Sequence, residues 1–361
     1  MNKKKVLFLA NGLGMGNSTR CYAVIEQLAD KGIIVDVMTS GNGVKFYSEK
    51  QGKSINRLVE TKSFKYAKDS SGKLSAFKTI MSVFQLARVY LENNKLVKRY
   101  IKENQPSVVV TDSEYVFLPM WFSKIPIVAL NNSDMVVASF FKLHDKPLSI
   151  YPQFFLVEFF DFMFHLLVAD KVVSPRLDCS KSYGKKFVKV PPIVRKSLKN
   201  DVYKGEVKNG VIMLSGSTFG SNVDLHNEKF PFQIDVIGRE GNDCEGLKFH
   251  GKLVNSLELL NKADFLVINA GFSAVSEGVC MKKPFIVIPV ENHAEQFINA
   301  KMIENMGCGF MSNTESMAES IKKIAHEINN FRDNCKKLSW DQSGAEEASK
   351  VILSCMKDHA G

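Results

Sequence analysis

The stretch "ADFLVINAGFSAVSEGVCMKKPFIVIPVENHAEQFINAKMIENMGCG" (residues 263–309) carries the most specific pattern in the chain. Its apolar run at 264–268 predicts a buried strand, and a helix is expected to begin near Ser273. The first turn of a helix presents unpaired N–H groups and the positive end of the helix dipole, which together attract anions. The stretch therefore predicts an anion-binding junction between a strand and a helix.

Polar side chains gather at this junction and at the next one. Glu277 lies four residues after Ser273, so the two share one face of the helix, where a carboxylate can accept hydrogen bonds from both hydroxyls of a ribose. The apolar run at 285–290 predicts the following strand, and Glu295 and Gln296 lie beyond it. An adjacent carboxylate and amide suit the hydroxyls of a sugar.

A second glycine-rich junction lies near the N-terminus, in "VLFLANGLGMGNSTR" (6–20). Gly12, Gly14 and Gly16 stand between an expected strand and an expected helix, where glycine permits a sharp turn and the close approach of a ligand. The spacing G-x-G-x-G differs from the G-x-G-x-x-G of dinucleotide-binding folds. The pattern predicts either a ligand site or a plain tight turn capped by Ser18.

Strands and helices alternate along the whole chain, which is typical of parallel sheets covered by helices on both faces. Strands are expected at 5–10, 33–38, 55–60, 107–111, 126–130, 171–174, 210–215, 232–237, 264–268 and 285–290. Helices are expected at 18–31, 74–104, 115–123, 150–168, 254–262, 273–281, 294–306, 314–328 and 344–358.

A charged segment with two prolines at 190–210 interrupts this alternation and predicts a domain linker. We expect an N-terminal domain at 1–193 and a C-terminal domain at 194–343, with the helix at 344–358 able to pack back on the first. The fold class is α/β, with two Rossmann-like, doubly wound parallel sheets that face a cleft. Ligands in such sheets bind beyond the carboxyl ends of the strands.

Composition limits the partners. The 361 residues carry a net charge of +10, and no nucleic-acid-binding motif is present, so phosphorylated small molecules or an anionic membrane are the expected partners. Seven scattered cysteines without a C-x-x-C pair predict a reduced, cytoplasmic chain without structural zinc. The apolar stretch after the basic start is too short for a signal peptide.

The aromatic run "YPQFFLVEFFDFMFHLL" (151–167) predicts a helix, with two alternatives for its surroundings. Its most apolar part, 154–167, contains Glu158, Asp161 and His165 and reads as too short to span a bilayer. Apolar side chains at helical spacing favour a core helix. The alternative is a helix that docks on an anionic membrane surface.

The stretch 263–309 resembles the donor-binding signature of GT-B glycosyltransferases. It is similar to that of the GlcNAc transferase of peptidoglycan lipid synthesis and of UDP-glucuronosyltransferase-like proteins. The resemblance covers most of the chain: "PPIVR" (191–195) is similar to the interdomain segment and "LSGSTFG" (214–220) to the first glycine loop of the donor domain.

This resemblance implies an inverting, metal-independent transfer of a sugar from a nucleotide-diphosphate donor, expected to be UDP-linked, to a hydroxyl acceptor. The acceptor would be a glycan or a lipid-linked molecule of envelope or surface polysaccharide synthesis. No cofactor is expected. The enzyme would be cytoplasmic, with a peripheral position at the inner face of the cell membrane.

The resemblance also implies the roles of the donor-site residues. Glu277 would hold the ribose, Ser273 and the backbone from Gly271 the diphosphate, and Glu295 with Gln296 the donor sugar. The remaining donor-site residues would lie beside the phosphates, the base or the path by which the donor enters: Gly14, Arg195, Gly216, Ser217, Leu253 and Asn269. At Asn269 many relatives carry a phosphate-binding histidine.

Asn17 departs from the family pattern. Many relatives have a histidine there, in a G-x-G-H-x-x-R pattern that ends at the equivalent of Arg20, and this histidine often deprotonates the acceptor. An asparagine amide cannot take up a proton at neutral pH. We therefore expect Asp112, at the end of the strand 107–111, to be the catalytic base. Asn17, Arg20 and Glu114 would bind the acceptor or donor, and the alternative for Asp112 is a helix cap.

Two other functions remain open from the sequence. A nucleotide-sugar hydrolase or epimerase of the same fold would keep the donor site and use water or no acceptor. The second is a catalytically inactive protein that binds a nucleotide sugar and assists another transferase. Asn17, which cannot act as a base, favours this alternative. Release of free sugar without an acceptor would indicate the former, and UDP binding without turnover the latter.

Overall fold

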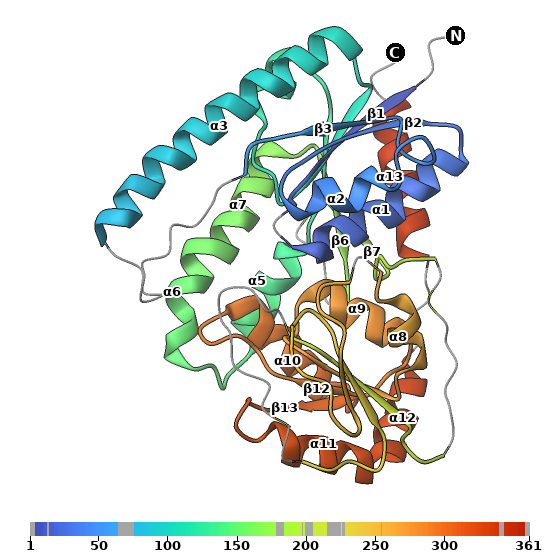
Figure 1. The fold of residues 1–361 in the computed structure, drawn as a ribbon. Coiled ribbons are helices and arrows are strands. Elements are labelled where there is room, and N and C mark those ends of the chain that lie inside the picture. The colour runs from blue at the N-terminus through green and yellow to red at the C-terminus, as the bar shows by residue number, and fades with distance from the viewer. Residues whose placement is uncertain are drawn as a thin grey trace.

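The computed structural model describes residues 4–12, 14–63, 76–177, 184–196, 198, 205–214, 225, 228–253, 255–338 and 343–357. Two sheets form the centres of an upper and a lower half (Figure 1). In both sheets every pair of neighbouring strands is parallel. The expectation of an α/β fold with two doubly wound parallel sheets is confirmed.

The upper, seven-stranded sheet has the order β3-β2-β1-β4-β5-β6-β7. Its strands are β1 (Lys5–Ala10), β2 (Ile34–Thr39), β3 (Arg57–Glu60), β4 (Val108–Asp112), β5 (Ile127–Leu130), β6 (Lys171–Pro175) and β7 (Phe187–Val190). The helices of this half are α1 (Met15–Asp30), α2 (Asn42–Ser48), α3 (Ala76–Asn104), α4 (Leu118–Ser123) and α5 (Ser133–Lys142). Central strands such as β5 are buried along their whole length, which explains their unbroken apolar sequence.

A continuous helical rod follows α5 and runs down the side of this half (Figure 1). It comprises the 3₁₀ turn η1 (Leu148–Ile150), α6 (Tyr151–Gln153), the π-helical turn η2 (Phe154–Glu158) and α7 (Phe159–Val168). The π-helical turn rotates the side chains that follow it relative to a regular α-helix. It lies where the rod contacts the lower half.

The lower, six-stranded sheet has the order β10-β9-β8-β11-β12-β13. Its strands are β8 (Asn209–Met213), β9 (Gln233–Val236), β10 (Leu247–Phe249), β11 (Phe265–Ile268), β12 (Phe285–Val287) and β13 (Gly309–Met311). Its helices are α8 (Leu257–Lys262), α9 (Phe272–Cys280), α10 (Ala294–Asn305), α11 (Met317–His326) and α12 (Ile328–Lys337).

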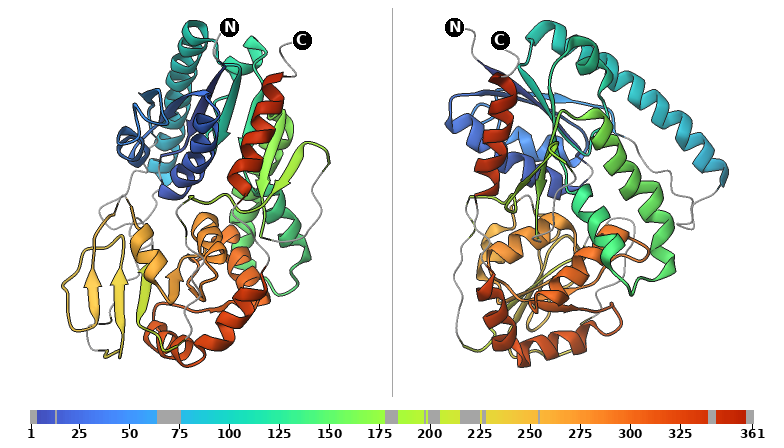
Figure 2. Two further views of the ribbon diagram at one scale, coloured as in Figure 1. Left: turned by 90° about the vertical axis from the view of Figure 1, so that its right-hand side faces the viewer. Right: turned by 180° about the vertical axis from the view of Figure 1, so that it is seen from behind.

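The last helix, α13 (Gly344–Lys357), packs on the upper half, beside β7 and α1 (Figure 2). Ala348 and Ile352 of α13 are fully buried in the same apolar cluster as Val24 of α1 and Val110 of β4. The chain thus crosses between the halves twice, once in each direction, and α13 stabilises the upper sheet with apolar surface from the C-terminal end.

Both sheets reverse their strand order at one point, between β1 and β4 above and between β8 and β11 below. At these points Ala10 pairs with Asp112 and Met213 with Ile268, each at the carboxyl end of its strand. The carboxyl ends of the two sheets face each other. Parallel sheets bind ligands at such switch points, so the fold places a common site between the halves.

The structure adds elements that the sequence pattern did not predict. The strands β7, β10 and β13 and the helices α2 and α5 fell in stretches read as loops. The three strands have only three or four residues, which give too little periodicity to detect. The helix expected at 314–328 is confirmed as α11, which ends at His326, and the separate helix α12, which begins at Ile328, was not expected.

Candidate active site

A pocket of about 860 Å³ lies between the two halves. The N-terminal ends of α1, α5, α9 and α10 contribute to its wall, so four positive helix-dipole ends converge on it. The pocket brings together eleven of the residues that the sequence singled out: Gly14, Asn17, Arg20, Arg195, Leu253, Asn269, Gly271, Ser273, Glu277, Glu295 and Gln296. Gly216 and Ser217 lie outside the described residues.

The glycine-rich junction meets α9 directly. The Ser273 hydroxyl donates a hydrogen bond of 3.1 Å to the Gly16 carbonyl oxygen, and a Cβ on Gly16 would lie 3.0 Å from that hydroxyl. Close helix contact therefore explains glycine at 16. At Gly14, which lines the pocket, an added Cβ would have no atom of the described residues within 4 Å apart from its chain neighbours. The bare backbone at 14 leaves space on the pocket side.

The turn between β11 and α9 is held by buried amides. Ala270 has a φ of +59°, a left-handed conformation that is unfavourable for alanine. The Asn299 amide of α10, fully buried, donates a 3.0 Å hydrogen bond to the Ala270 carbonyl, and the Asn269 amide donates to the Ile288 carbonyl at 2.8 Å. Nothing in the local sequence singled out Asn299, because it lies 29 residues from its partner.

Arg195 and Glu277 bind each other. The guanidinium donates from Nε and Nη2 to the two carboxylate oxygens of Glu277, at 2.6 and 2.7 Å. Both side chains are nearly buried, with 12 and 9% of their surface exposed. A bidentate pair of this kind fixes the planes of both groups. The residue expected at the ribose and the one expected at the phosphates are thus neighbours in one wall of the pocket.

The wall formed by α10 is shared with the upper half. Gln296 accepts the Val290 N–H at 2.9 Å through its Oε1, which leaves its NH₂ group on the pocket side, and the Asn132 amide of the upper half reaches Glu295 at 3.4 Å. Asn131, Asn132 and Ser133, at the start of α5, all line the pocket. The sequence analysis missed these three residues, because it predicted the strand at 126–130 and not the helix α5 that follows it.

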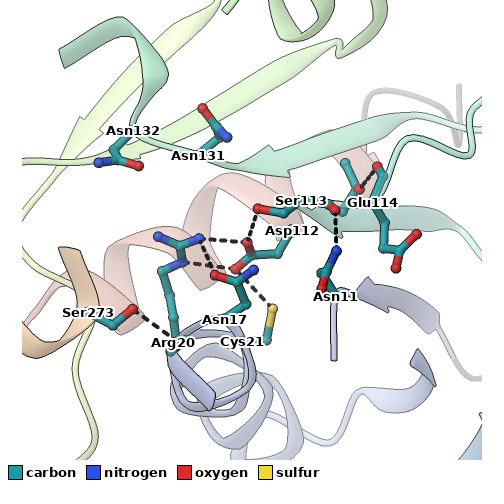
Figure 3. Close-up of polar contacts among 12 residues, drawn as sticks. Asn11, Asn17, Arg20, Cys21, Asp112, Ser113, Glu114, Asn131, Asn132 and Ser273 are labelled. Atoms are coloured by element: carbon teal, nitrogen blue, oxygen red, sulfur yellow. Dashed lines mark hydrogen bonds and ion pairs between the residues drawn. The ribbon is translucent and has the colours of Figure 1, made fainter. Parts of the chain in front are cut away.

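The structure shows Asp112, the expected catalytic base, as the ion-pair partner of Arg20. Its carboxylate is fully buried and accepts two hydrogen bonds from Arg20, at 2.9 and 2.6 Å, while the Cys21 thiol contacts it at 3.4 Å (Figure 3). Asp112 is not among the residues that line the pocket. It positions Arg20, whose second nitrogen also lies 3.5 Å from the Asn17 amide oxygen.

Glu114 is likewise apart from the pocket-lining residues, and Figure 3 shows its carboxylate pointing away from Asn17 and Arg20. The backbone turns at Ser113, which has a φ of +52°, and that Glu114 binds the acceptor stays a prediction. Burial, and after it the charge of Asp112, raise the pKa of Glu114 to about 7.

The helical rod has one buried and one exposed face. Phe154, Phe162 and His165 are buried, whereas Leu156 and Phe160 are 78 and 63% exposed. The rod is therefore a core helix on its buried face, while its other face is open to the surface. By length and composition alone, the rod from Leu148 to Val168, which is longer than the run 154–167, is also able to cross a membrane.

Comparisons with known proteins agree with this architecture. The model of the family described as Glycosyl transferase family 1 matches residues 4–329. A UDP-N-acetylglucosamine--N-acetylmuramyl-(pentapeptide) pyrophosphoryl-undecaprenol N-acetylglucosamine transferase from Clostridium novyi is 22% identical and covers 99% of both chains. An uncharacterised glycosyltransferase from Methanosarcina acetivorans is 24% identical over 96% of this chain and 97% of its own.

Solved structures show the same fold. MurG from Acinetobacter baumannii superposes with a TM-score of 0.62 at 13% identity, over 97% of this chain and 99% of its own. LpCGTa, solved in complex with UDP, has a TM-score of 0.68 at 14% identity, over 98 and 99% of the two chains. The expected GT-B arrangement of two Rossmann-like halves is confirmed by this likeness.

Proposed function

The chain belongs to glycosyl transferase family 1 and is a glycosyltransferase, and from that premise we propose that it moves a sugar from a UDP-linked donor to a hydroxyl acceptor with inversion. One observation carries the proposal. The helix N-termini, Arg20 and Arg195 converge on a single pocket that also holds Glu277 and the Glu295–Gln296 pair. Its volume is that of an ordinary small-molecule site.

Charge decides the chemistry that such a pocket favours. When the bond between the anomeric carbon and the diphosphate breaks, negative charge grows on the leaving diphosphate. The N-terminus of α9, whose Ser273 hydroxyl donates to the Gly16 carbonyl oxygen, lies on the lower wall with Arg195, and the helix end and the guanidinium are placed to stabilise that charge. We propose that they replace the divalent cation that many other sugar transferases use.

The individual contacts proposed for the donor follow the lower wall. Glu277 takes the ribose hydroxyls and Leu253 borders the base, while Asn269 and Gly271 lie near the diphosphate. Glu295 and Gln296 take the sugar hydroxyls. In this assignment residues 194–343 bind the donor, with Gly14 beside it, and residues 1–193 bind the acceptor through Asn17 and Arg20. The pocket-lining amides Asn131 and Asn132 add polar groups to the acceptor side.

We further propose that the acceptor is lipid-linked and that the enzyme acts at the inner membrane face. Six large apolar side chains, here called the apolar surface, are each 59 to 86% exposed: Trp121, Phe122, Phe141, Leu156, Phe160 and Leu167. Exposed Lys124 and Lys142 flank it. Val157 of the same rod lines the pocket, so a lipid tail held at the surface would present its head group to the site.

Thermal stabilisation by nucleotides tests the donor assignment. UDP and UDP-sugars are expected to raise the melting temperature more than GDP-, dTDP- or CMP-sugars, since a ligand at 100 times its Kd adds about 2.7 kcal/mol to the unfolding free energy. Glu277→Ala should lose most of that shift. A wild-type protein that no nucleotide stabilises would contradict the proposed function.

Turnover then separates the remaining possibilities. UDP release that depends on an added lipid-linked acceptor supports the transferase. Free sugar released from the donor at the same rate without any acceptor would instead support a hydrolase of the same fold.

A further inference from the structure

Three titratable side chains meet in the pocket across the two halves. Glu158 comes from the π-helical turn η2 of the upper half, and His293 and Glu295 come from the start of α10 below. One ligand atom of each lies within 4.8 Å of the others, and all three residues line the pocket. The cluster exists only when the halves are together.

Gln153 aligns Glu158 with α10. Its Nε2 donates to the Glu158 carboxylate at 2.7 Å, while its Oε1 accepts the Ala294 N–H, at the first turn of α10, at 2.8 Å. This amide bridge leaves the second Glu158 oxygen for another partner. Glu158 itself is only 8% exposed, so its carboxylate is oriented and mostly shielded from water.

Three other carboxylates near the pocket are held at both oxygens, whereas Glu295 accepts one long hydrogen bond of 3.4 Å from Asn132 and is assigned to the donor sugar. Glu277 is held at both oxygens by Arg195, and Asp112 at both oxygens by Arg20. Asp161 accepts from the Tyr115 hydroxyl at 2.9 Å and from the Asn131 amide at 2.8 Å. Within the described residues, Glu158 has a hydrogen bond to one oxygen, and the buried Nδ1 of His293 has none.

We propose that Glu158 is the catalytic base that takes the proton of the acceptor hydroxyl, with His293 beside it as the positioning partner. The inference rests on the proposed function. The acceptor O–H bond breaks and its proton passes to the Glu158 carboxylate. The oxygen's electron pair forms the new bond to the anomeric carbon, and the bond from that carbon to the diphosphate breaks, its electron pair leaving with the nucleoside diphosphate.

The electrostatic surroundings favour a base of moderate strength. Burial, then the charge of Glu295 and that of Asp161, raise the pKa of Glu158 to about 8, although the Gln153 amide acts in the opposite direction. The titratable groups that face Glu158 are Glu295 and His293 from α10, Asp161 from α7 and Tyr115 from the loop after β4; α5 presents the Asn132 amide. A base near the working pH transfers protons efficiently.

The test compares Glu158→Gln with wild type and with Glu319→Gln, the same change at an exposed position on α11. UDP release from UDP-GlcNAc is measured with water as the acceptor and with 2,4,5-trichlorophenol, which is largely ionised at the assay pH. We expect Glu158→Gln to slow reaction with water at least roughly 100-fold and with the phenolate less than about threefold. With water as the acceptor, wild-type kcat/KM for UDP-GlcNAc should rise from pH 6 to 9. This rise should disappear in Glu158→Gln.

Each contrary result has a definite meaning. Equal losses with both acceptors, or wild-type rates and an unchanged pH profile in Glu158→Gln, would overturn the base assignment while leaving the transferase intact. Wild-type turnover lost in EDTA and restored by Mn²⁺, with Mn²⁺ binding lost in Glu158→Gln, would make the cluster a metal site and overturn it too. A wild type that binds no UDP would remove the proposed function, and this inference with it.

Discussion

Arg195 holds Glu277 at both carboxylate oxygens, with N–O distances of 2.6 and 2.7 Å, in a wall of the proposed donor site. A ribose that binds Glu277 would meet a carboxylate already fixed in plane by the guanidinium. Arg195 therefore orients Glu277 besides contributing charge to the pocket.

Glu277→Ala is predicted to weaken UDP binding by roughly tenfold or more, since hydrogen bonds to a charged group contribute about 1.5–3 kcal/mol. Arg195→Ala should weaken it as well, because it removes a positive charge and releases Glu277. Titration calorimetry with UDP measures both effects. If the double variant binds UDP no worse than either single variant, the two residues act as a unit; unchanged binding in Glu277→Ala would refute the ribose assignment.

Gly14 and Gly16 provide a matched pair of substitutions. Gly14 has a φ of −117° and ψ of 153°, which alanine adopts readily, and its Cβ would meet no atom of the described residues within 4 Å apart from its chain neighbours. Gly14→Ala should keep the wild-type melting temperature and lose UDP binding or turnover. Gly16→Ala should lower the melting temperature as well, because its Cβ would press on the Ser273 hydroxyl. A Gly14→Ala enzyme with full activity would show that no ligand approaches there.

Asp112→Asn is predicted to lower the free energy of unfolding. The change removes the charge that pairs with Arg20, which is only 5% exposed, and breaking a buried ion pair at one partner typically costs about 3–5 kcal/mol. Urea unfolding should show this loss. A variant with wild-type stability and a kcat reduced 100-fold or more would instead restore Asp112 as the base.

The raised pKa of Glu114 predicts that the free energy of unfolding depends on pH. Its pKa is raised from 4.5 to about 7, so the folded state binds the proton more tightly than the unfolded state does. Its contribution to stability is present below pH 4.5 and is lost as the pH rises through 7, by about 3 kcal/mol in total. Glu158 acts in the same direction, so the wild-type decline contains both contributions.

Glu114→Gln should remove the Glu114 contribution. Its unfolding free energy relative to wild type should therefore increase between pH 4.5 and 7, as measured by urea titration at several pH values. A difference that stays constant over this range would contradict the raised pKa.

The apolar surface predicts membrane association. Sedimentation with phosphatidylglycerol vesicles should recover the wild-type protein at low salt and less of it at high salt, since salt screens the lysines that flank the surface. The double change Leu156→Asp and Phe160→Asp should reduce the bound fraction at least tenfold, because each buried side chain contributes about 1.5–3 kcal/mol. Both positions are exposed, so the melting temperature should remain unchanged. Equal binding by wild type and variant would exclude this surface.

The sequence by itself determined the fold class and most of the residues that line the lower wall of the pocket. Strands buried on both faces must be apolar along their length, and the junctions that follow them carry Gly14, Ser273, Glu277, Glu295 and Gln296 within a few residues of a strand end. Because parallel strands share one carboxyl edge, position next to a strand end was enough to bring these residues into one pocket.

Only the tertiary structure decided how the charged groups are paired. Arg20 lies 92 residues from Asp112, and Arg195 lies 82 residues from Glu277, so no local pattern shows that each carboxylate is already held. Glu158 and His293 come from different halves and meet only through the packing of the helical rod on α10. A proton acceptor depends on burial and on nearby charges, and these are properties of the folded arrangement that residue type and spacing do not contain.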